Sequence, residues 1–183
     1  MKRKNFFGAL RFSFALVALV IGSGVMAQSN RKDRRLAEDC TDAQAEFVRV
    51  DGLMKNLFEK SYGYVIFPNV GKGGIGIGGA AGNGIVYEGG NIVGKGKMTQ
   101  VSIGFQFGGQ AYREVIFFEN KEAFDRFKED RLEFSAQASA VAATAGASAN
   151  VKYANGVMIF TQQKGGLMYE ASVGGQKFDF TAF

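Results

Sequence analysis

Residues 63–87 read Gly-Tyr-Val-Ile-Phe-Pro-Asn-Val-Gly-Lys-Gly-Gly-Ile-Gly-Ile-Gly-Gly-Ala-Ala-Gly-Asn-Gly-Ile-Val-Tyr, and this stretch decides the class of fold. Its β-branched and aromatic residues are interrupted by glycine with a period of two, which favours strands over helices. We expect a first strand at 64–67. Pro68-Asn69 should end it, because proline cannot donate a hydrogen bond to a neighbouring strand.

Glycine alternates with isoleucine later in the same stretch. Within 74–78 the glycines, Gly76 among them, fall on one face of a strand, and Ile75 and Ile77 fall on the other. A strand face built of glycine favours the close approach of another backbone. Asn83-Gly84 is typical of a two-residue hairpin turn, so a further strand is expected directly after it.

Upstream of this stretch the sequence is poor in glycine and its period changes. Residues 31–60 contain one glycine, Gly52, and their apolar residues recur at alternating spacings of four and three: Leu36, Cys40, Ala43, Phe47, Val50, Met54 and Leu57. This spacing predicts an apolar stripe along a helix, which Gly52 splits in two. We expect the stripe to pack on the domain's own sheet and to bury Cys40. The alternatives are a helix that contacts a membrane or a protein partner, and a Cys40 that pairs between chains.

Downstream, more strands and one short helix are expected. The expected strands cover 99–107, 113–118, 156–161, 167–173 and 177–180. Asn120 is a suitable N-cap for a helix over 121–130, with Phe124 and Phe127 on its inner side. The alanine-rich stretch 136–149 fits either a helix or a strand, and we favour a strand. The sequence therefore predicts an α+β fold. An N-terminal helical segment packs on a glycine-rich, mainly antiparallel β-sheet or small barrel-like sheet, with one short additional helix.

The first residues have the form of an export signal. Lys2, Arg3 and Lys4 precede an apolar run over 12–21, and small residues follow it up to Ala27. This pattern predicts a signal peptide over 1–27, cleaved before Gln28, and hence a periplasmic or secreted protein. A retained anchor is the alternative, although the run is shorter than the roughly 20 residues that span a bilayer. A basic N-terminal segment over 28–35 and a single domain over 36–183 are expected to follow.

Composition excludes several classes of function. The chain has no His and one Cys, so it lacks an imidazole base, a Cys–His pair and the common zinc ligands. Gly74, Gly76 and Gly79 fit a dinucleotide-binding pattern, but the helix that should follow them is absent. The net charge of +5 arises mostly in the leader, because removing its four basic residues leaves 18 basic and 17 acidic residues. We therefore expect no enzyme, no catalytic residue, no metal, no cofactor and no nucleic-acid partner.

One group of basic residues remains after the leader. Arg31, Lys32, Arg34 and Arg35, here called the basic cluster, surround a single acid, Asp33. Such a group is either a solvated tail or an electrostatic anchor for anionic headgroups. In the second case each basic residue contributes about 1 kcal/mol near the surface. The residues by themselves favour the solvated tail.

Seven segments share their order and character with one known family. They begin with Ser61-Tyr-Gly-Tyr-Val-Ile-Phe-Pro-Asn-Val-Gly-Lys-Gly-Gly74 and continue through 78–86, 102–108, 115–118, 134–141, 157–161 and 164–174. On these residues the chain resembles the SYLF domain family of lipid-binding proteins, some of whose eukaryotic members regulate actin. The likeness covers nearly all of 36–180. It departs from the family at Thr144-Ala145-Gly146, where a Gly-Pro is usual.

The resemblance implies binding to anionic phospholipid at a membrane surface through a basic N-terminal segment, which is where the basic cluster lies. An exported protein would not meet actin, so lipid binding is expected and actin binding is not. The protein is then periplasmic or secreted, with peripheral attachment to a membrane. One alternative is an extracytoplasmic scaffold that binds a protein partner through the helical stripe. An outer-membrane β-barrel is less favoured, because Phe178 and Phe180 are out of phase with the terminal Phe183.

Overall fold

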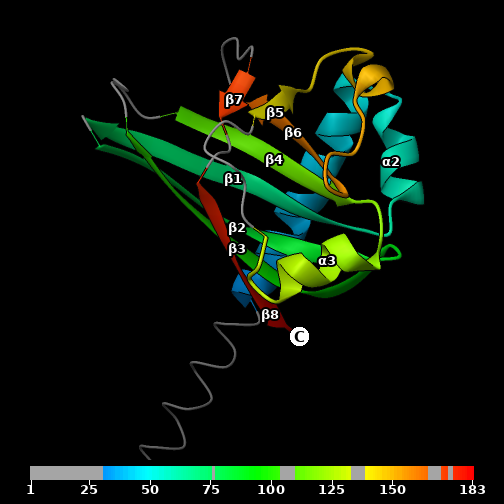
Figure 1. The fold of residues 1–183 in the computed structure, drawn as a ribbon, viewed down its shortest axis with the longest axis horizontal. Helices are drawn as coiled ribbons and strands as arrows, with labels where there is room; N and C mark the ends of the chain where they lie inside the picture. The colour runs from blue at the N-terminus through cyan, green and yellow to red at the C-terminus, as the bar shows by residue number, and fades with distance from the viewer. Residues whose placement is uncertain (1–30, 76, 104–109, 133–138, 165–169, 173–174) are drawn as a thin grey trace, which may run out of the picture. The chain divides into compact units, whose positions relative to one another are not determined.

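The structure is a computed structural model that describes residues 31–183 except 76, 104–109, 133–138, 165–169 and 173–174 (Figure 1). Helix covers 31–50, and α2 covers Met54–Lys60, so the predicted break at Gly52 is confirmed. The strands are β1 Gly63–Ile75, β2 Ile77–Glu88, β3 Asn91–Ile103, β4 Gln110–Phe118, β5 Ser139–Ala142, β6 Val157–Gln163, β7 Glu170–Ser172 and β8 Gln176–Ala182. Helix α3, Lys121–Lys128, follows β4, and a 3-10 turn η1, Ala147–Asn150, follows β5.

The strands form one open sheet in the order β7-β5-β6-β4-β1-β2-β3-β8. Neighbouring strands are antiparallel except β5 and β6, which run parallel. The predicted α+β class is therefore confirmed. The chain divides into two compact units, residues 1–35 and 36–183, and the whole sheet belongs to the second.

The sheet is strongly curled. The Nε2 atom of Gln176 on β8 donates a hydrogen bond to Oε2 of Glu114 on β4 over 3.0 Å. In the strand order β4 and β8 are four steps apart, which in a flat sheet is about 19 Å at the usual spacing of neighbouring strands. The two side chains can meet only if the sheet bends until its inner face partly encloses them.

Both faces of the sheet are buried, each by different elements. On the outer face the N-terminal helix and α2 cover one apolar cluster, which includes Phe47, Tyr64 and Phe117. On the inner face α3 and β8 cover a second cluster, which includes Phe67, Phe127 and Phe178. In β1, β2, β4 and β6, alternate residues belong to alternate clusters, as the period of two requires.

Strand β1 does not end at Pro68, as the sequence predicts, but continues to Ile75. The pairing of β1 with β2 and with β4 shifts at this point, so Pro68 lies at a β-bulge. A bulge tolerates the missing N–H of proline. It also explains why Phe67 and Val70, an odd number of residues apart, are buried in the same inner cluster.

The predicted positions of two chain reversals are wrong. Ile75 ends β1 and Ile77 begins β2, and the two residues pair, so 74–78 is not one strand; Gly76 itself lies outside the described residues. Asn83-Gly84 is not a turn but lies inside β2, opposite Lys97 and Gly96. A Cβ atom on Gly84 would lie 2.3 Å from the Ile66 carbonyl oxygen, so glycine is needed there for close packing. The reversal into β3 uses Gly89 and Gly90, whose φ angles of 55° and 82° suit glycine.

The expected downstream elements are largely confirmed. Asn120 caps α3, its side chain accepting a hydrogen bond from the Ala123 N–H over 3.0 Å, and Phe124 and Phe127 are buried. The alanine-rich stretch forms a strand only over Ser139–Ala142 and continues into η1; residues 136–138 lie outside the described part. The expected strands at 99–107 and 167–173 also extend into residues that are not described.

Candidate functional site

The basic cluster lies on the N-terminal helix rather than on an irregular tail. Arg31, Lys32, Arg34 and Arg35 are all exposed, and Asp33 is half-buried. At 100° per residue the four basic side chains fall within an arc of about 160°, with Asp33 on the other side of the helix. The helix therefore presents four cationic groups together to solvent. They belong to the first of the two compact units.

The apolar stripe of the same helix is buried within the second unit. Cys40, Ala43 and Phe47 have no exposed surface and belong to the cluster on the outer face of the sheet. The predicted packing of the stripe on the domain's own sheet is thereby confirmed. In this conformation the stripe is not available to a membrane or to a partner.

Cys40 is buried, as the sequence predicts. Its Sγ atom donates to the Ile66 carbonyl oxygen over 3.4 Å, and burial raises the pKa of the thiol to about 12. The thiol is therefore protonated at neutral pH. A protonated, enclosed thiol cannot form the disulfide between chains that was the alternative.

The solvent face of the helix changes sign after the basic cluster. Glu38, Asp39 and Asp42 are exposed, and Glu46 is half-buried beside Arg49. The Arg49 guanidinium donates to Glu46 over 2.8 Å, and this hydrogen bond lowers the pKa of Glu46. An anionic surface would repel this acidic part of the helix, so it should contact only the basic end.

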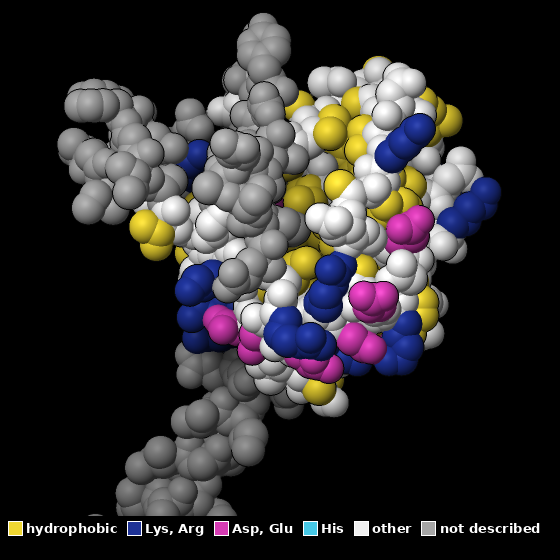
Figure 2. Space-filling model, viewed as in Figure 1, with side chains coloured by type: hydrophobic (Ala, Val, Ile, Leu, Met, Phe, Trp, Pro, Cys, Tyr) yellow, Lys and Arg dark blue, Asp and Glu magenta, His cyan; other side chains and the backbone are white. Residues whose placement is uncertain are grey.

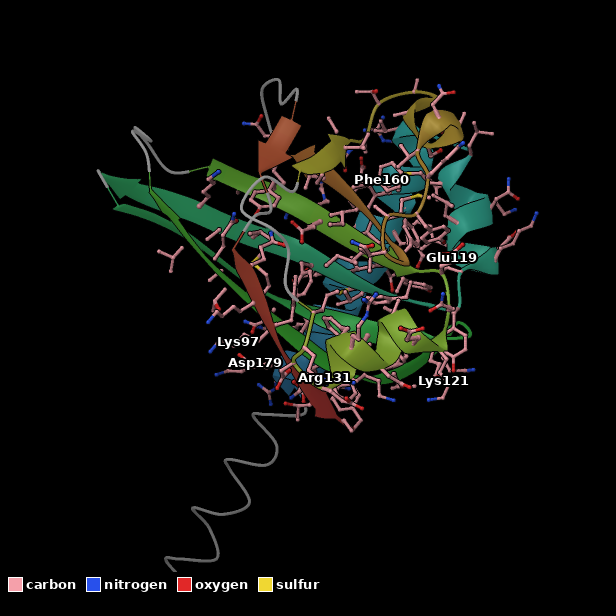
Figure 3. The ribbon with its side chains drawn as sticks, viewed as in Figure 1. Lys97, Glu119, Lys121, Arg131, Phe160 and Asp179 are labelled. Carbon is pink, nitrogen blue, oxygen red and sulfur yellow. The ribbon has the colours of Figure 1, made fainter. Side chains whose placement is uncertain are left out.

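The charged residues around α3 form a solvated surface of mixed sign. Figure 2 shows Lys, Arg, Asp and Glu side chains intermixed over this helix. Lys121 pairs with Asp125 and Arg131 pairs with Glu129, and both basic residues point outward in Figure 3. Because the two signs neutralise each other, this surface is a weaker candidate for anionic lipid than the basic cluster.

Sequence analysis missed a polar group inside the curled sheet. Glu114 and Gln176 are fully buried and share the hydrogen bond that joins β4 to β8, and Tyr112 lies on the same face. Burial raises the pKa of Glu114 to about 7, although the hydrogen bond from Gln176 opposes this shift. The sequence does indicate that this side chain is buried, because Glu114 lies on the same strand face as the apolar Ile116 and Phe118.

A second buried carboxylate connects the helical segment to the alanine-rich loop. Asp51 accepts hydrogen bonds from the backbone N–H groups of Ser148 and Leu53 over 2.8 and 3.1 Å. Burial would raise the pKa of Asp51, but these backbone hydrogen bonds outweigh it and lower the pKa. The contact is structural, because it satisfies the N–H groups of Leu53, directly before α2, and of Ser148 in η1.

The predicted signal peptide over 1–27 lies outside the described residues, so the structure does not bear on it. Within the described part of the chain, no helix is long and apolar enough to cross a membrane. Among the same residues, no three His, Cys, Asp or Glu side chains gather as metal ligands would.

Comparison with known proteins identifies the domain. Residues 99–181 match the Ysc84 family, described as Las17-binding protein actin regulator. The matched residues, less than half of the chain, are thus similar to the Ysc84 (SYLF) family. A stretch of 127 residues, 68% of this chain, is 31% identical to beta cell expansion factor A of Aeromonas veronii. The chain spans about half, 48%, of the length of that relative.

The SYLF match confirms the resemblance predicted from the sequence, and it has a clear boundary. It begins in β3 and ends in β8, so it includes Glu114 and Gln176 but not β1 and β2, which lie between their strands in the sheet. The basic cluster lies outside the matched residues.

Proposed function

We propose that this protein is a non-enzymatic, exported domain that binds anionic phospholipid at a membrane surface through Arg31, Lys32, Arg34 and Arg35. The observation that carries the proposal is the exposure of all four side chains on one arc of a helix. Four cations near an anionic surface contribute about 4 kcal/mol before the cost of ordering their side chains. The resemblance of this chain to the SYLF family of lipid-binding proteins supports the proposal.

The mode of binding follows from the rest of the helix. The apolar stripe is occupied by the domain's own core, so the helix cannot lie flat and insert Phe47 without unfolding part of the outer cluster. Beyond Arg35 the next exposed charged side chains are acidic, namely Glu38, Asp39 and Asp42. Binding through this helix is therefore electrostatic and limited to its basic end.

Vesicle co-sedimentation tests the proposal with two variants of equal charge. In the first, Arg31, Lys32, Arg34 and Arg35 are changed to Glu. In the control, four exposed lysines outside the cluster, Lys55, Lys60, Lys121 and Lys152, are changed to Glu. The first variant should no longer sediment with vesicles containing phosphatidylglycerol, whereas the control should retain most of its binding. Equal loss in both variants would mean that net charge, not the cluster, governs binding.

A second candidate function is binding to a protein partner, because the family model is described as Las17-binding. The helical stripe first considered for this role is buried, so a partner would need another surface. Recovery of one stoichiometric partner from the exported protein, together with no binding to any vesicle, would favour this function over lipid binding.

A further inference from the structure

The ends of three strands extend beyond their neighbours in the sheet. Among the residues that the structure describes, β4 pairs with β1 as far as Lys72, and β8 pairs with β3 as far as Gln100. Three rows of paired residues lie beyond this point: Gly73–Gly79–Val101, Gly74–Gly78–Ser102 and Ile75–Ile77–Ile103. We call these rows the ribbon end. In Figure 1 it extends away from α2 and α3.

The ribbon end carries no charge. The sequence contains no Asp, Glu, Lys or Arg from Gly73 to Tyr87 or from Met98 to Tyr112, in a chain that is 21% charged overall. Val101 has 72% of its surface exposed, the largest fraction of any exposed large hydrophobic residue described. A Cβ atom on Gly71, two residues before the ribbon end, would meet nothing within 4 Å. Val101 is therefore an exposed apolar side chain in an uncharged part of the sheet.

Lysines follow directly behind the uncharged rows. Lys72 lies in the first row behind Val101, paired with Ala80, and Lys177 lies in the next, paired with Thr99. Lys97 lies two rows farther back, opposite Asp179 on β8 (Figure 3). Lys97 and Lys177 are exposed, and Lys72 is half-buried. An apolar tip with cations behind it matches the order of layers in an anionic membrane, where headgroups lie outside the acyl chains.

We propose that the ribbon end inserts into the interface of an anionic phospholipid membrane, with Lys72 and Lys177 at the headgroups. Three residues beyond Lys72 reach about 10 Å, close to the depth at which interfacial segments lie. Lysine side chains can extend their ammonium groups back to the headgroups while their stems remain in apolar surroundings. No described residue of β4 or β8 pairs with the outer edges of β1 and β3 here, and such edges restrict insertion to the hydrated interface. The inference rests on the proposed lipid binding and adds a second point of contact.

The absence of tryptophan from the chain allows a direct test. Val101→Trp places a single fluorophore at the ribbon end. Ile92→Trp places it at the other end of β3, where Ile92 is 48% exposed, as the matched control. With vesicles of phosphatidylglycerol and phosphatidylcholine, emission from Val101→Trp should shift to shorter wavelength and be quenched by brominated acyl chains. Emission from Ile92→Trp should not change. Unchanged emission from Val101→Trp in protein that sediments with the vesicles would overturn the inference.

A pair of charge substitutions gives a second measurement. Val101→Glu should weaken vesicle binding about fivefold, the effect of a charge near the interface, and Ile92→Glu should not. If both variants bind like the wild type while reversal of the basic cluster abolishes binding, the ribbon end does not contact lipid but the proposed function stands. If the wild type binds no anionic vesicle, both proposals fail. Thermal midpoints of the two Glu variants should agree with the wild type, because both positions are exposed.

Discussion

At the residue scale, Glu114 shows how a single ionisable group controls the stability of the curled sheet. Its pKa is about 7 in the folded chain against an ordinary 4.5, because burial disfavours the carboxylate. Between these values the folded state holds a proton that the unfolded state releases. The stabilising contribution is therefore complete below pH 4.5 and is lost as pH rises to about 7. Across this range the residue lowers the free energy of unfolding by about 3 kcal/mol.

Glu114→Gln should remove this dependence, because glutamine cannot ionise and can still accept the hydrogen bond from Gln176. Between pH 5 and pH 8 the wild type should lose about 3 kcal/mol more stability than the variant. Urea denaturation at both pH values measures the difference. The control is Glu119→Gln, at an exposed carboxyl, which should follow the wild type. An equal loss in wild type and Glu114→Gln would show that Glu114 does not titrate in this range.

The positions of some residues could be predicted from the sequence, and those of others could not, for a physical reason. Asn120 and Cys40 were predictable because a cap and a helical stripe depend on neighbours within a few turns. The partner of Glu114 was not, since Gln176 comes from a strand 62 residues away. The alternation of residues along its strand indicates that the Glu114 side chain is buried. It does not identify the residue that this side chain contacts.

At the element scale, glycines in strands have two roles that sequence patterns do not separate. The sequence predicts a turn at Gly84, because Asn-Gly is typical of hairpins. The structure instead requires it where β2 passes the backbone of Ile66 and the ring of Phe67. Pro68 likewise predicts the end of a strand, but β1 continues past it. At a β-bulge the missing N–H of proline leaves no strand-pairing hydrogen bond unmade. Turn signals describe local chain preferences, whereas the register of long strands is set by packing across the sheet.

Substitution of two glycines by alanine should separate these roles. Gly84→Ala places a Cβ atom 2.3 Å from the Ile66 oxygen and should destabilise the fold by about 1–3 kcal/mol. Gly71→Ala, in β1, meets nothing within 4 Å and should be neutral or raise stability by up to about 1 kcal/mol. Thermal midpoints of the two variants give the comparison. A loss of the same size in both would mean that the strands require backbone flexibility, not close approach.

At the scale of the whole molecule, the sequence predicts the class of fold but not the curl of the sheet. Periodicity identifies strands and helices because it depends on neighbouring residues. The contact between β4 and β8 depends on how eight strands bend together. The ribbon end could not be predicted from the sequence for a related reason. Its uncharged rows come from three separate segments and become continuous only in the paired sheet.

The predicted export also concerns the whole chain. The charged start, short apolar run and small residues before Gln28 predict that the protein is processed at Ala27–Gln28. The intact mass of exported protein should correspond to a chain that begins at Gln28. A full-length mass in the membrane fraction would instead support a retained anchor.

The two proposed lipid contacts should respond differently to salt, which makes ionic strength a test of the whole molecule. Attraction between the basic cluster and anionic headgroups is screened over about 10 Å at 0.1 M salt and about 3 Å at 1 M. Burial of an apolar ribbon end is not screened in this way. Wild-type binding to phosphatidylglycerol vesicles should therefore fall steeply as salt rises and then level off above zero. Val101→Glu should lower this plateau. Reversal of the basic cluster should abolish binding at low salt, where its new acids repel the headgroups. Binding that falls to zero in the wild type would mean that charge alone holds the protein on the membrane.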